Sequence, residues 1–306
     1  MALDALTYAG TMTNLADVED RITFVEADIS DSVAMQRVLD AYEIDTVVNF
    51  AAESHNSLAV LEPKRFFQTN VIGTQTLLDA CMRAAVRHFH HVSTYEVYGG
   101  LSPESRTAFT EGSPYRPRTP YNGSKAAADH AVRVYHETFG LPITITNCVN
   151  NYGPNQFPEK VLPLFITQAL EGRKLPVYAG ENTRREWIHV RDHCRAVDTV
   201  VQSGRIGETY HVGTGVETSV DRLADIVLDE LGLPSTLKTS VAERPGHDRR
   251  HLLDSGKIRR ELGWRAETDF DSGVRETIRW YAANRNWWAP LRERNPVVET
   301  AWASGR

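Results

Sequence analysis

Short apolar runs alternate with longer segments of helical periodicity through the first half of the chain. The runs are rich in β-favouring residues and are predicted as strands at 21–27, 45–50, 88–93 and 143–148. The segments between them carry apolar residues at helical spacing and are predicted as helices at 32–42, 63–85 and 122–140. Strands separated by helices run parallel and are covered on both faces. The alternation therefore predicts an α/β fold with a doubly wound, Rossmann-like parallel sheet.

The pattern changes after residue 148. From "NNYGPNQFPEK" (150–160) onward, prolines, glycines and aromatic residues interrupt short elements, as expected of a smaller lobe. We expect residues 1–148 to form a dinucleotide-binding domain, to which part of 187–212 returns. Residues 149–306 then form mainly a substrate-binding lobe. In such folds the ligands bind in the crevice at the carboxyl ends of the strands.

Composition excludes several classes of function. The chain has 306 residues and a net charge of −6, which gives no reason to expect nucleic acid or a membrane as partner. No apolar run approaches the ~18 residues of a membrane helix, and the N-terminus does not have the pattern of a signal peptide. The three cysteines lie far apart, and the histidines of "HFHH" (88–91) have no ligands at zinc-site spacing. We expect a cytoplasmic protein with reduced cysteines and no metal.

Polar side chains crowd the end of the predicted strand at 88–93. Ser93, Thr94, Tyr95 and Glu96 follow one another within "HVSTYEVYGG". Strand ends of this kind are where α/β enzymes place their chemistry.

A tyrosine and a lysine share one face at the start of the next predicted helix. In "YNGSK", Tyr121 and Lys125 stand four residues apart. A phenol has a pKa of about 10, and a neighbouring ammonium favours the phenolate. The pair is therefore predicted to transfer protons near neutral pH, beside the polar strand end.

These residues and several longer stretches resemble the dTDP-glucose 4,6-dehydratase family of extended short-chain dehydrogenases/reductases. The similarity runs from the first residues to about Tyr281. The stretches that carry it are "DALTYAG" (4–10), "FAAESH" (50–55), "TNVIGTQTLLDA" (69–80), "TNCVNNYGPNQFPEK" (146–160), "REWIHVRDHCRA" (185–196), "ERPGHDRRHLLD" (243–254) and "RELGW" (260–264).

The resemblance implies NAD as cofactor and a dTDP-linked or other nucleotide-linked hexose as substrate. It implies catalytic roles for Thr94, Tyr95, Glu96, Tyr121 and Lys125. The implied cofactor-binding residues are Asp4, Thr7, Asp28, Ile29, Ala51, Ala52, Ser54, Asn70, Tyr121 and Lys125. The implied substrate-binding residues are His55, Asn147, Glu159, Lys160, Tyr178, Arg185, Arg244 and His247.

The implied reaction is the loss of water from the sugar by way of transient oxidation at C4. Tyr121, assisted by Lys125 and Thr94, takes the proton of the 4-hydroxyl while NAD takes hydride. Glu96 then removes the proton from C5, an acid expels the C6 hydroxyl, and hydride returns to C6.

The resemblance also implies a homodimer. Two helices from each chain, at 63–85 and 126–140, would form a four-helix interface. Apolar positions at helical spacing are expected to carry it, and they include Leu77, Leu78, Met82, Ala127, Val132 and Tyr135.

Four features depart from the family pattern, and three of them are the following. A glycine-rich phosphate loop belongs about 20 residues before Asp4, which places it ahead of Met1, so NAD binding is expected to be weak or absent. The first strand of the Rossmann-like sheet, which precedes that loop and is central to the sheet, is expected to be missing as well. The family has an Asp–Arg pair shortly after the position of His55, where this chain has the neutral residues Asn56, Ser57 and Leu58. Either the loss of these charges weakens the polar organisation of the substrate crevice, or the segment is a surface loop whose sequence varies without consequence. Val216 replaces an asparagine expected to contact the pyrophosphate.

The most consequential departure is Tyr95, which stands where the family has an aspartic acid that donates a proton to the leaving hydroxyl. A phenol is a weaker acid than a carboxyl group by about six pKa units, and it is much longer. Tyr95 either packs into a vacated pocket or serves as an acid itself. The expected function is a 4,6-dehydratase-like lyase, with an epimerase and a non-catalytic nucleotide-sugar-binding protein or partner subunit as alternatives.

Overall fold

A computed structural model of the chain describes residues 1–178 and 183–295. Its largest sheet has four parallel strands in the order β3-β4-β5-β9. Their bounds are Thr46–Asn49 for β3, His88–Thr94 for β4, Ile143–Cys148 for β5 and Thr209–Val212 for β9. The strands predicted at 45–50, 88–93 and 143–148 are confirmed, and so is the parallel α/β class of the fold.

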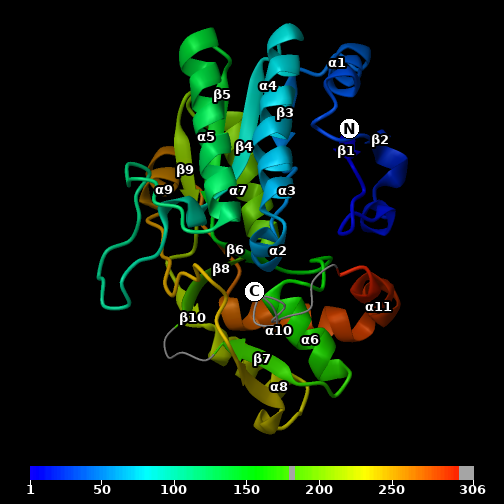
Figure 1. The fold of residues 1–306 in the computed structure, drawn as a ribbon, viewed down its shortest axis with the longest axis vertical. Helices are drawn as coiled ribbons and strands as arrows, with labels where there is room; N and C mark the ends of the chain where they lie inside the picture. Colours follow the sequence, from blue (N-terminus) through cyan, green and yellow to red (C-terminus); the bar gives the residue numbers. More distant parts are fainter. Residues whose placement is uncertain (179–182, 296–306) are drawn as a thin grey trace.

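Two further parallel strands form a separate small sheet. β1 (Ala2–Asp4) pairs with β2 (Phe24–Glu26), with Ala2 opposite Phe24. The predicted strand at 21–27 is therefore present but shorter. This sheet lies beside α1 (Ser32–Ala41) at the edge of the molecule (Figure 1).

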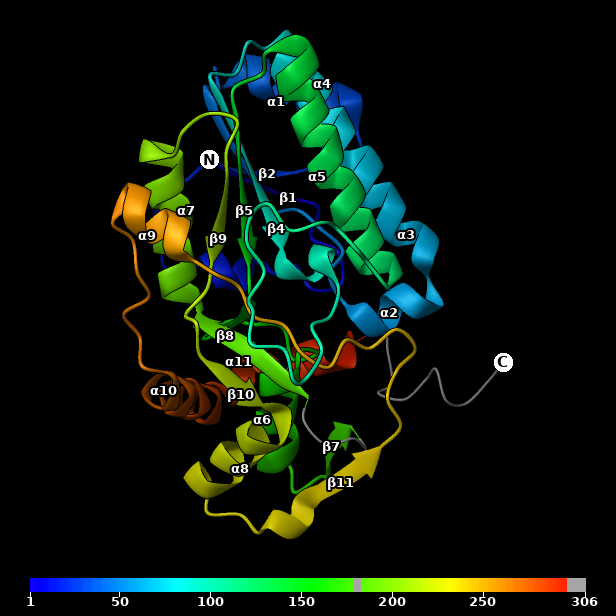
Figure 2. The same cartoon turned by 90° about the vertical axis from the view of Figure 1, so that its left-hand side faces the viewer.

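Helices cover the four-stranded sheet from both sides. Figure 2 shows α4 (Thr74–Arg83) and α5 (Pro120–Phe139) on one side, and α7 (Val190–Ser203) and α9 (Gly256–Leu262) on the other. The start of α5 is set by Thr119, whose hydroxyl accepts a hydrogen bond from the Asn122 amide at 3.2 Å, followed by a proline at the first helical position.

The helix predicted at 63–85 is interrupted. It consists of α3 (Pro63–Phe67), a π-helical segment at Gln68–Gly73 and α4. Asn70, in the π segment, accepts a hydrogen bond from the Glu53 amide at 2.8 Å and donates to the Glu53 carbonyl at 2.9 Å. The π segment thus turns one polar side chain inward, where it holds the loop after β3.

Five of the six apolar positions named for a dimer interface face the chain's own core instead, and Ala127 is the exception. Leu77, Leu78 and Val132 are buried in a cluster with residues of β4 and β5, and Met82 and Tyr135 pack against it. Helical periodicity shows that a helix has an apolar face, but the partner that covers this face here is the sheet of the same chain.

The C-terminal half builds a second layered unit below the four-stranded sheet in Figure 1. One sheet has the order β10-β8-β6, and β7 pairs with β11 in parallel. The strands are β6 (Asn150–Tyr152), β7 (Leu175–Tyr178), β8 (Arg184–His189), β10 (Glu217–Ser219) and β11 (Lys238–Val241). The helices are α6 (Val161–Leu170), α8 (Val220–Glu230), α10 (Phe270–Ala283) and α11 (Arg285–Glu293).

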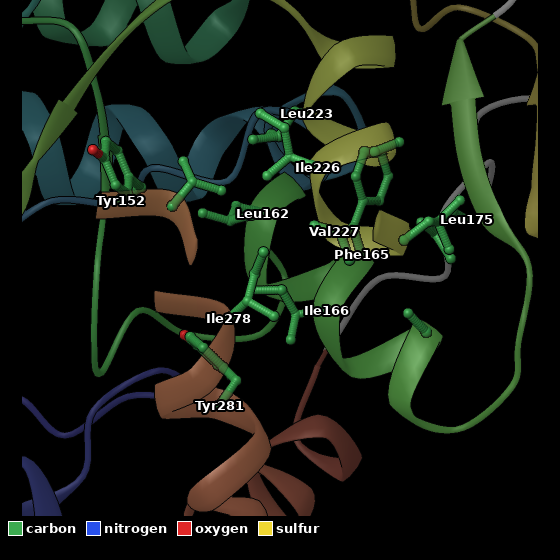
Figure 3. Close-up of a cluster of buried hydrophobic side chains, with 14 of the residues drawn as sticks. Tyr152, Leu162, Phe165, Ile166, Leu175, Leu223, Ile226, Val227, Ile278 and Tyr281 are labelled. Atoms are coloured by element: carbon green, nitrogen blue, oxygen red, sulfur yellow. The ribbon is translucent and has the colours of Figure 1, made fainter. Parts of the chain in front are cut away.

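This half has its own apolar core, in which side chains of α6, α8 and α10 meet (Figure 3). Phe165 of α6, Val227 of α8 and Ile278 of α10 are all fully buried there. A rigid core of this kind fixes the loops that face the four-stranded sheet.

Short elements connect these layers. They are α2 (Asn56–Leu61) and the 3₁₀ turns at Met12–Leu15, Glu19–Arg21, Tyr95–Tyr98 and Ser235–Leu237. The turn at Tyr95–Tyr98 is called η4 below. Among the residues described, no helix has the length and apolar character needed to cross a membrane.

The end of η4 depends on a glycine. Gly99 has φ +76°, and a Cβ there would lie 2.4 Å from the Arg116 carbonyl oxygen. Gly140, which ends α5 with φ +75°, has space for a Cβ. We expect Gly99→Ala to lower the free energy of unfolding by about 3 kcal/mol and Gly140→Ala by about 1 kcal/mol. Urea denaturation measures both, and equal losses would show that the clash at Gly99 is relieved.

Candidate active site

A cavity of about 530 Å³ lies between the carboxyl ends of β3, β4 and β5 and the C-terminal half. The structure brings all five predicted catalytic residues to this cavity. The predicted site residues that line it are Ala52, Ser54, His55, Thr94, Tyr95, Glu96, Tyr121, Lys125, Glu159, Lys160, Tyr178, Arg185, Arg244 and His247.

Lys125 is held against β4. It is 3% exposed, and its Nζ donates to the Val92 carbonyl at 2.7 Å and lies 3.3 Å from His91 Nε2. Burial disfavours the ammonium and lowers the pKa of Lys125, while the nearby Asp129 carboxylate opposes that shift.

Tyr121 lies one helical turn earlier on α5, and its ring packs edge-on against Phe66 of α3 at 6.3 Å between centroids. Burial, followed by the Glu96 carboxylate, raises the pKa of Tyr121, and hydrogen bonding by Thr94 opposes the rise. This direction is opposite to the one expected from Lys125. The ammonium is directed to the strand carbonyl, so burial decides the pKa of the phenol.

Thr94 and Glu96 are positioned by the η4 turn at the end of β4. The Thr94 hydroxyl accepts a hydrogen bond from the Glu96 amide at 3.3 Å and so caps the turn. The Glu96 carboxylate accepts from Asn56 Nδ2, which lies 3.1 Å from each of its oxygens. Asn56 is one of the positions at which the sequence departs from the family pattern. Its contact with Glu96 depends on how α2 packs against the strand ends, and it was therefore not predicted.

Tyr95 points into the protein interior. It is 1% exposed, its hydroxyl donates to Asn150 Oδ1 at 2.9 Å, and its ring packs edge-on against His251 at 4.6 Å between centroids. Burial raises the pKa of Tyr95 well above its ordinary value. A phenol that is buried, engaged and hard to ionise fits the packing interpretation of this residue better than the acid interpretation.

The far wall of the cavity carries a buried acid–base cluster. Lys160 Nζ donates to the Ser54 carbonyl at 2.7 Å and lies 3.6 Å from Glu159. Burial raises the pKa of Glu159. Burial, together with Lys160 and Arg244, lowers the pKa of His55 to about 3, so this imidazole is neutral at physiological pH.

Arg185 and Arg244 form a cationic end of the cavity, beside the imidazole of His247. Arg185 Nη2 lies 2.9 Å from His247 Nε2, and the Tyr178 ring packs edge-on against His247 at 5.0 Å. Burial and the neighbouring guanidinium groups lower the pKa of His247 to about 2. Arg244 Nε is buried without a partner among the described residues. These donors suit a diphosphate, whose oxygens match guanidinium groups.

The other predicted cofactor residues lie outside the cavity. Asp4 and Asp28 stand at or just after the ends of β1 and β2, and each carboxylate caps the backbone two residues on. Thr7 and Ala51 are exposed, whereas Ile29 and Asn70 are buried. Their roles toward NAD stay predictions.

Asn147 is buried beneath the strand ends rather than in the cavity lining. Its amide donates to the Thr94 carbonyl at 3.0 Å, so it supports the η4 turn. In contrast, the cavity is also lined by four residues that were not predicted from the sequence: Cys148, Asn150, Asn151 and His193. The described residues contain no group of three or more His, Cys, Asp and Glu side chains that could hold a metal ion.

Comparisons with known proteins identify the family of the chain. A family model for GDP-mannose 4,6 dehydratase matches residues 1–277. The dTDP-glucose 4,6-dehydratase of Streptomyces antibioticus is 46% identical over 95% of this chain and 85% of its own length. The enzyme of the same name from Shigella flexneri is 45% identical over 93% of this chain and 86% of its own.

A solved structure shows the same fold. DesIV from Streptomyces venezuelae, a dTDP-glucose 4,6-dehydratase crystallised with NAD and TYD bound, matches with a TM-score of 0.91 and 47% identity. The match covers 94% of this chain and 89% of that one. The parallel sheet with a Tyr-x-x-x-Lys pair at its carboxyl edge is that of a short-chain dehydrogenase/reductase. Within that class, the chain belongs to the dTDP-glucose 4,6-dehydratase family.

A histidine of the cavity wall gives a testable pH dependence. His193 is 6% exposed, and burial lowers its pKa from 6.5 to about 4. Between these values the unfolded chain binds a proton there that the folded chain does not. The free energy of unfolding therefore falls as the pH falls, by up to ~1.4 kcal/mol per pH unit for this group.

We expect His193→Asn to show a shallower loss of stability between pH 6.5 and 4 than the unmodified chain. Urea denaturation at a series of pH values measures it. Above pH 7 the two proteins should share one pH dependence, because the imidazole is neutral in both the folded and unfolded states. Parallel curves at acid pH would contradict the assignment.

Proposed function

We propose that this chain is an NAD-dependent nucleotide-sugar lyase of the dTDP-glucose 4,6-dehydratase type, acting on dTDP-glucose. The observation that carries the proposal is the convergence of Thr94, Glu96, Tyr121 and Lys125 at one strand end inside a cavity with a cationic far end. The close relatives named above support the same reaction.

The predicted site residues of the cavity have separate roles in the proposed reaction. Tyr121 accepts the proton of the 4-hydroxyl, and the Thr94 hydroxyl lies beside it as a hydrogen-bonding partner. Glu96 removes the C5 proton once C4 is a ketone, because a carbonyl acidifies the adjacent C–H. Arg185 and Arg244 hold the diphosphate, and Tyr178 packs beside the base.

The cavity also fits the nicotinamide half of NAD. Ala52 keeps the side-chain volume small at the end of β3, and Ser93, which lines the same wall, has a buried hydroxyl without a partner among the described residues. Such a hydroxyl suits a polar ligand group. When bound, NAD⁺ would supply the acceptor and later the donor of the hydride, and its positive charge would favour the ionised form of Tyr121.

Tyr95 distinguishes this chain within the proposed reaction. Its hydroxyl donates to Asn150 and is buried, so it does not supply a proton to a departing hydroxyl in this arrangement. We infer that C4 oxidation and C5 deprotonation are retained and that loss of water is slow. Reprotonation of C5 without water loss gives an epimerase, and binding without oxidation gives a non-catalytic homologue; both are outcomes of the experiment below.

We expect Tyr95→Asp to raise formation of the 4-keto-6-deoxy sugar by about 10²-fold or more, since general acid catalysis typically contributes 10²–10⁴-fold. The assay supplies dTDP-glucose and excess NAD and measures the keto sugar. Tyr95→Phe, which keeps the ring and removes only the hydroxyl, should match the unmodified chain. Adding Glu96→Gln to Tyr95→Asp should abolish the gain, because no base then forms the C5 carbanion.

The results of this experiment distinguish between Tyr95 as a packing residue and Tyr95 as a catalytic acid. Loss of a pre-existing activity in Tyr95→Phe would show that the phenol is this protein's own acid. Absence of keto sugar, reduced nicotinamide and C5 exchange in every variant would leave nucleotide-sugar binding as the function.

We also propose a homodimer through the outer faces of α3, the π segment and α5. Large apolar side chains are exposed there: Phe67 at 43%, Ile72 at 48% and Val134 at 53%. Phe67 lies next to Gly123 of α5, and α5 packs against both α3 and the π segment. Exposed apolar side chains on adjacent helices favour association with a second copy.

We expect Val134→Asp to halve the mass measured by light scattering at micromolar concentration, because it buries a charge in that contact. Val33→Asp is the matched control, since Val33 is 75% exposed on α1, away from the proposed contact. A monomeric mass for the unmodified chain would contradict the proposal.

The same proposal includes a dinucleotide-binding domain at 1–148, to which part of 187–212 returns, and a lobe at 149–306 that mainly binds the nucleotide sugar. It also includes a cytoplasmic location. The apolar core of the C-terminal half, separate from that around the four-stranded sheet, supports the division.

A further inference from the structure

A single amide group connects α2 with the η4 turn. Asn56, the first residue of α2, places its Nδ2 3.1 Å from Oε1 and 3.1 Å from Oε2 of Glu96. Both residues line the cavity, and both are partly buried. One donor shared between two oxygens restrains the rotation of the carboxylate about its terminal bond.

The orientation of the Asn56 amide is fixed by a second contact. Its Oδ1 accepts a hydrogen bond from the Thr119 hydroxyl at 3.3 Å. Rotating the amide by half a turn would place its carbonyl oxygen against the Glu96 carboxylate, which repels it. Only one of the two amide orientations therefore satisfies both neighbours.

Thr119 also caps α5, the helix that carries Tyr121 and Lys125. The chain of contacts runs from the start of α5 through Asn56 to Glu96. It therefore ties the proposed base for C5 to the helix that holds the proposed base for the 4-hydroxyl, although the two bases lie on different elements.

We propose that Asn56 is a positioning residue that holds the Glu96 carboxylate in place for removal of the C5 proton. This rests on the function proposed above. In that step the C5–H bond breaks, Glu96 takes the proton, and the electron pair passes into the enolate of the C4 ketone. Asn56 acts on this step through Glu96 and has no part in oxidation at C4, which depends on Tyr121.

The proposal separates two steps of one turnover. Misplacing a catalytic group by about 1 Å can cost ~10²-fold. Loss of the Asn56 donor should therefore slow exchange of the C5 hydrogen with solvent by about 10- to 100-fold. Oxidation at C4 should stay within about threefold, because its acceptor for the hydroxyl proton is unchanged.

The experiment mixes the full chain with excess NAD and dTDP-glucose in heavy water. Absorbance of the reduced nicotinamide reports oxidation at C4, and mass spectrometry reports deuterium at C5. The variants are Asn56→Asp and Asn56→Leu. Asn56→Asp keeps the size of the side chain and an acceptor for Thr119 but removes the donor, so we expect it to lose at least as much C5 exchange as Asn56→Leu.

Leu61→Ala, at the other end of α2 and 44% exposed, controls for disturbance of the helix and should leave the ratio of the two rates unchanged. Formation of reduced nicotinamide by each variant shows that its site is folded. Full C5 exchange in Asn56→Asp would overturn the proposal, because size alone would then suffice. A proportional fall of both rates would also overturn it, since Asn56 would then act on substrate binding.

The two proposals fail in different ways. An unmodified chain that neither reduces NAD nor exchanges C5 would reject the proposed function, and the role of Asn56 with it. The other outcome is that the unmodified chain reduces NAD and exchanges the C5 hydrogen, and that the Asn56 variants show the same ratio of these two rates. This outcome would reject the role of Asn56 but not the proposed function.

Discussion

The ammonium of Lys125 is the constraint on which the site depends. A buried charge is costly unless hydrogen bonds and an opposite charge compensate it. Here the Val92 carbonyl and His91 lie within hydrogen-bonding reach, and Asp129 lies one turn further along α5. These partners hold α5 in one position against β4. Because Tyr121 lies one turn before Lys125, and Thr94 two residues after Val92, the same docking brings the phenol and the hydroxyl together.

Much of the fold could be predicted because periodicity reports burial directly. Three strands of the four-stranded sheet, β3, β4 and β5, lie where the apolar runs predicted them, and α5 matches the helix predicted at 122–140. The fourth strand, β9, was not predicted as a strand. The π segment at Gln68–Gly73 could not be predicted, since it follows from the contacts of Asn70 with residues far along the chain. Leu77 and Leu78 show the complementary limit: spacing finds an apolar face, but not the surface that covers it.

The candidate site could likewise be predicted from the sequence only in part. Thr94, Glu96, Tyr121 and Lys125 could be grouped from the sequence because a parallel sheet gathers its strand ends at one edge. The contact between Asn56 and Glu96 depends on how α2 docks, which no local pattern specifies. The direction of the Tyr121 pKa depends on burial and on where the Lys125 ammonium points. Spacing along a helix settles neither, so the expectation from the sequence had the wrong sign.

Tyr95 shows how one substitution can separate the two halves of an acid–base pair. Its neighbour Glu96 stays in the cavity because the η4 turn and Asn56 hold it there, independently of the side chain at 95. The Tyr95 ring instead fills space beside His251, and its proton is donated to Asn150 on β6. A phenol has a single proton to donate, so it cannot serve Asn150 and a departing hydroxyl at once. The proposed base, Glu96, therefore keeps its place in the cavity. The side chain at position 95, where the family has its acid, instead packs between the two halves of the chain.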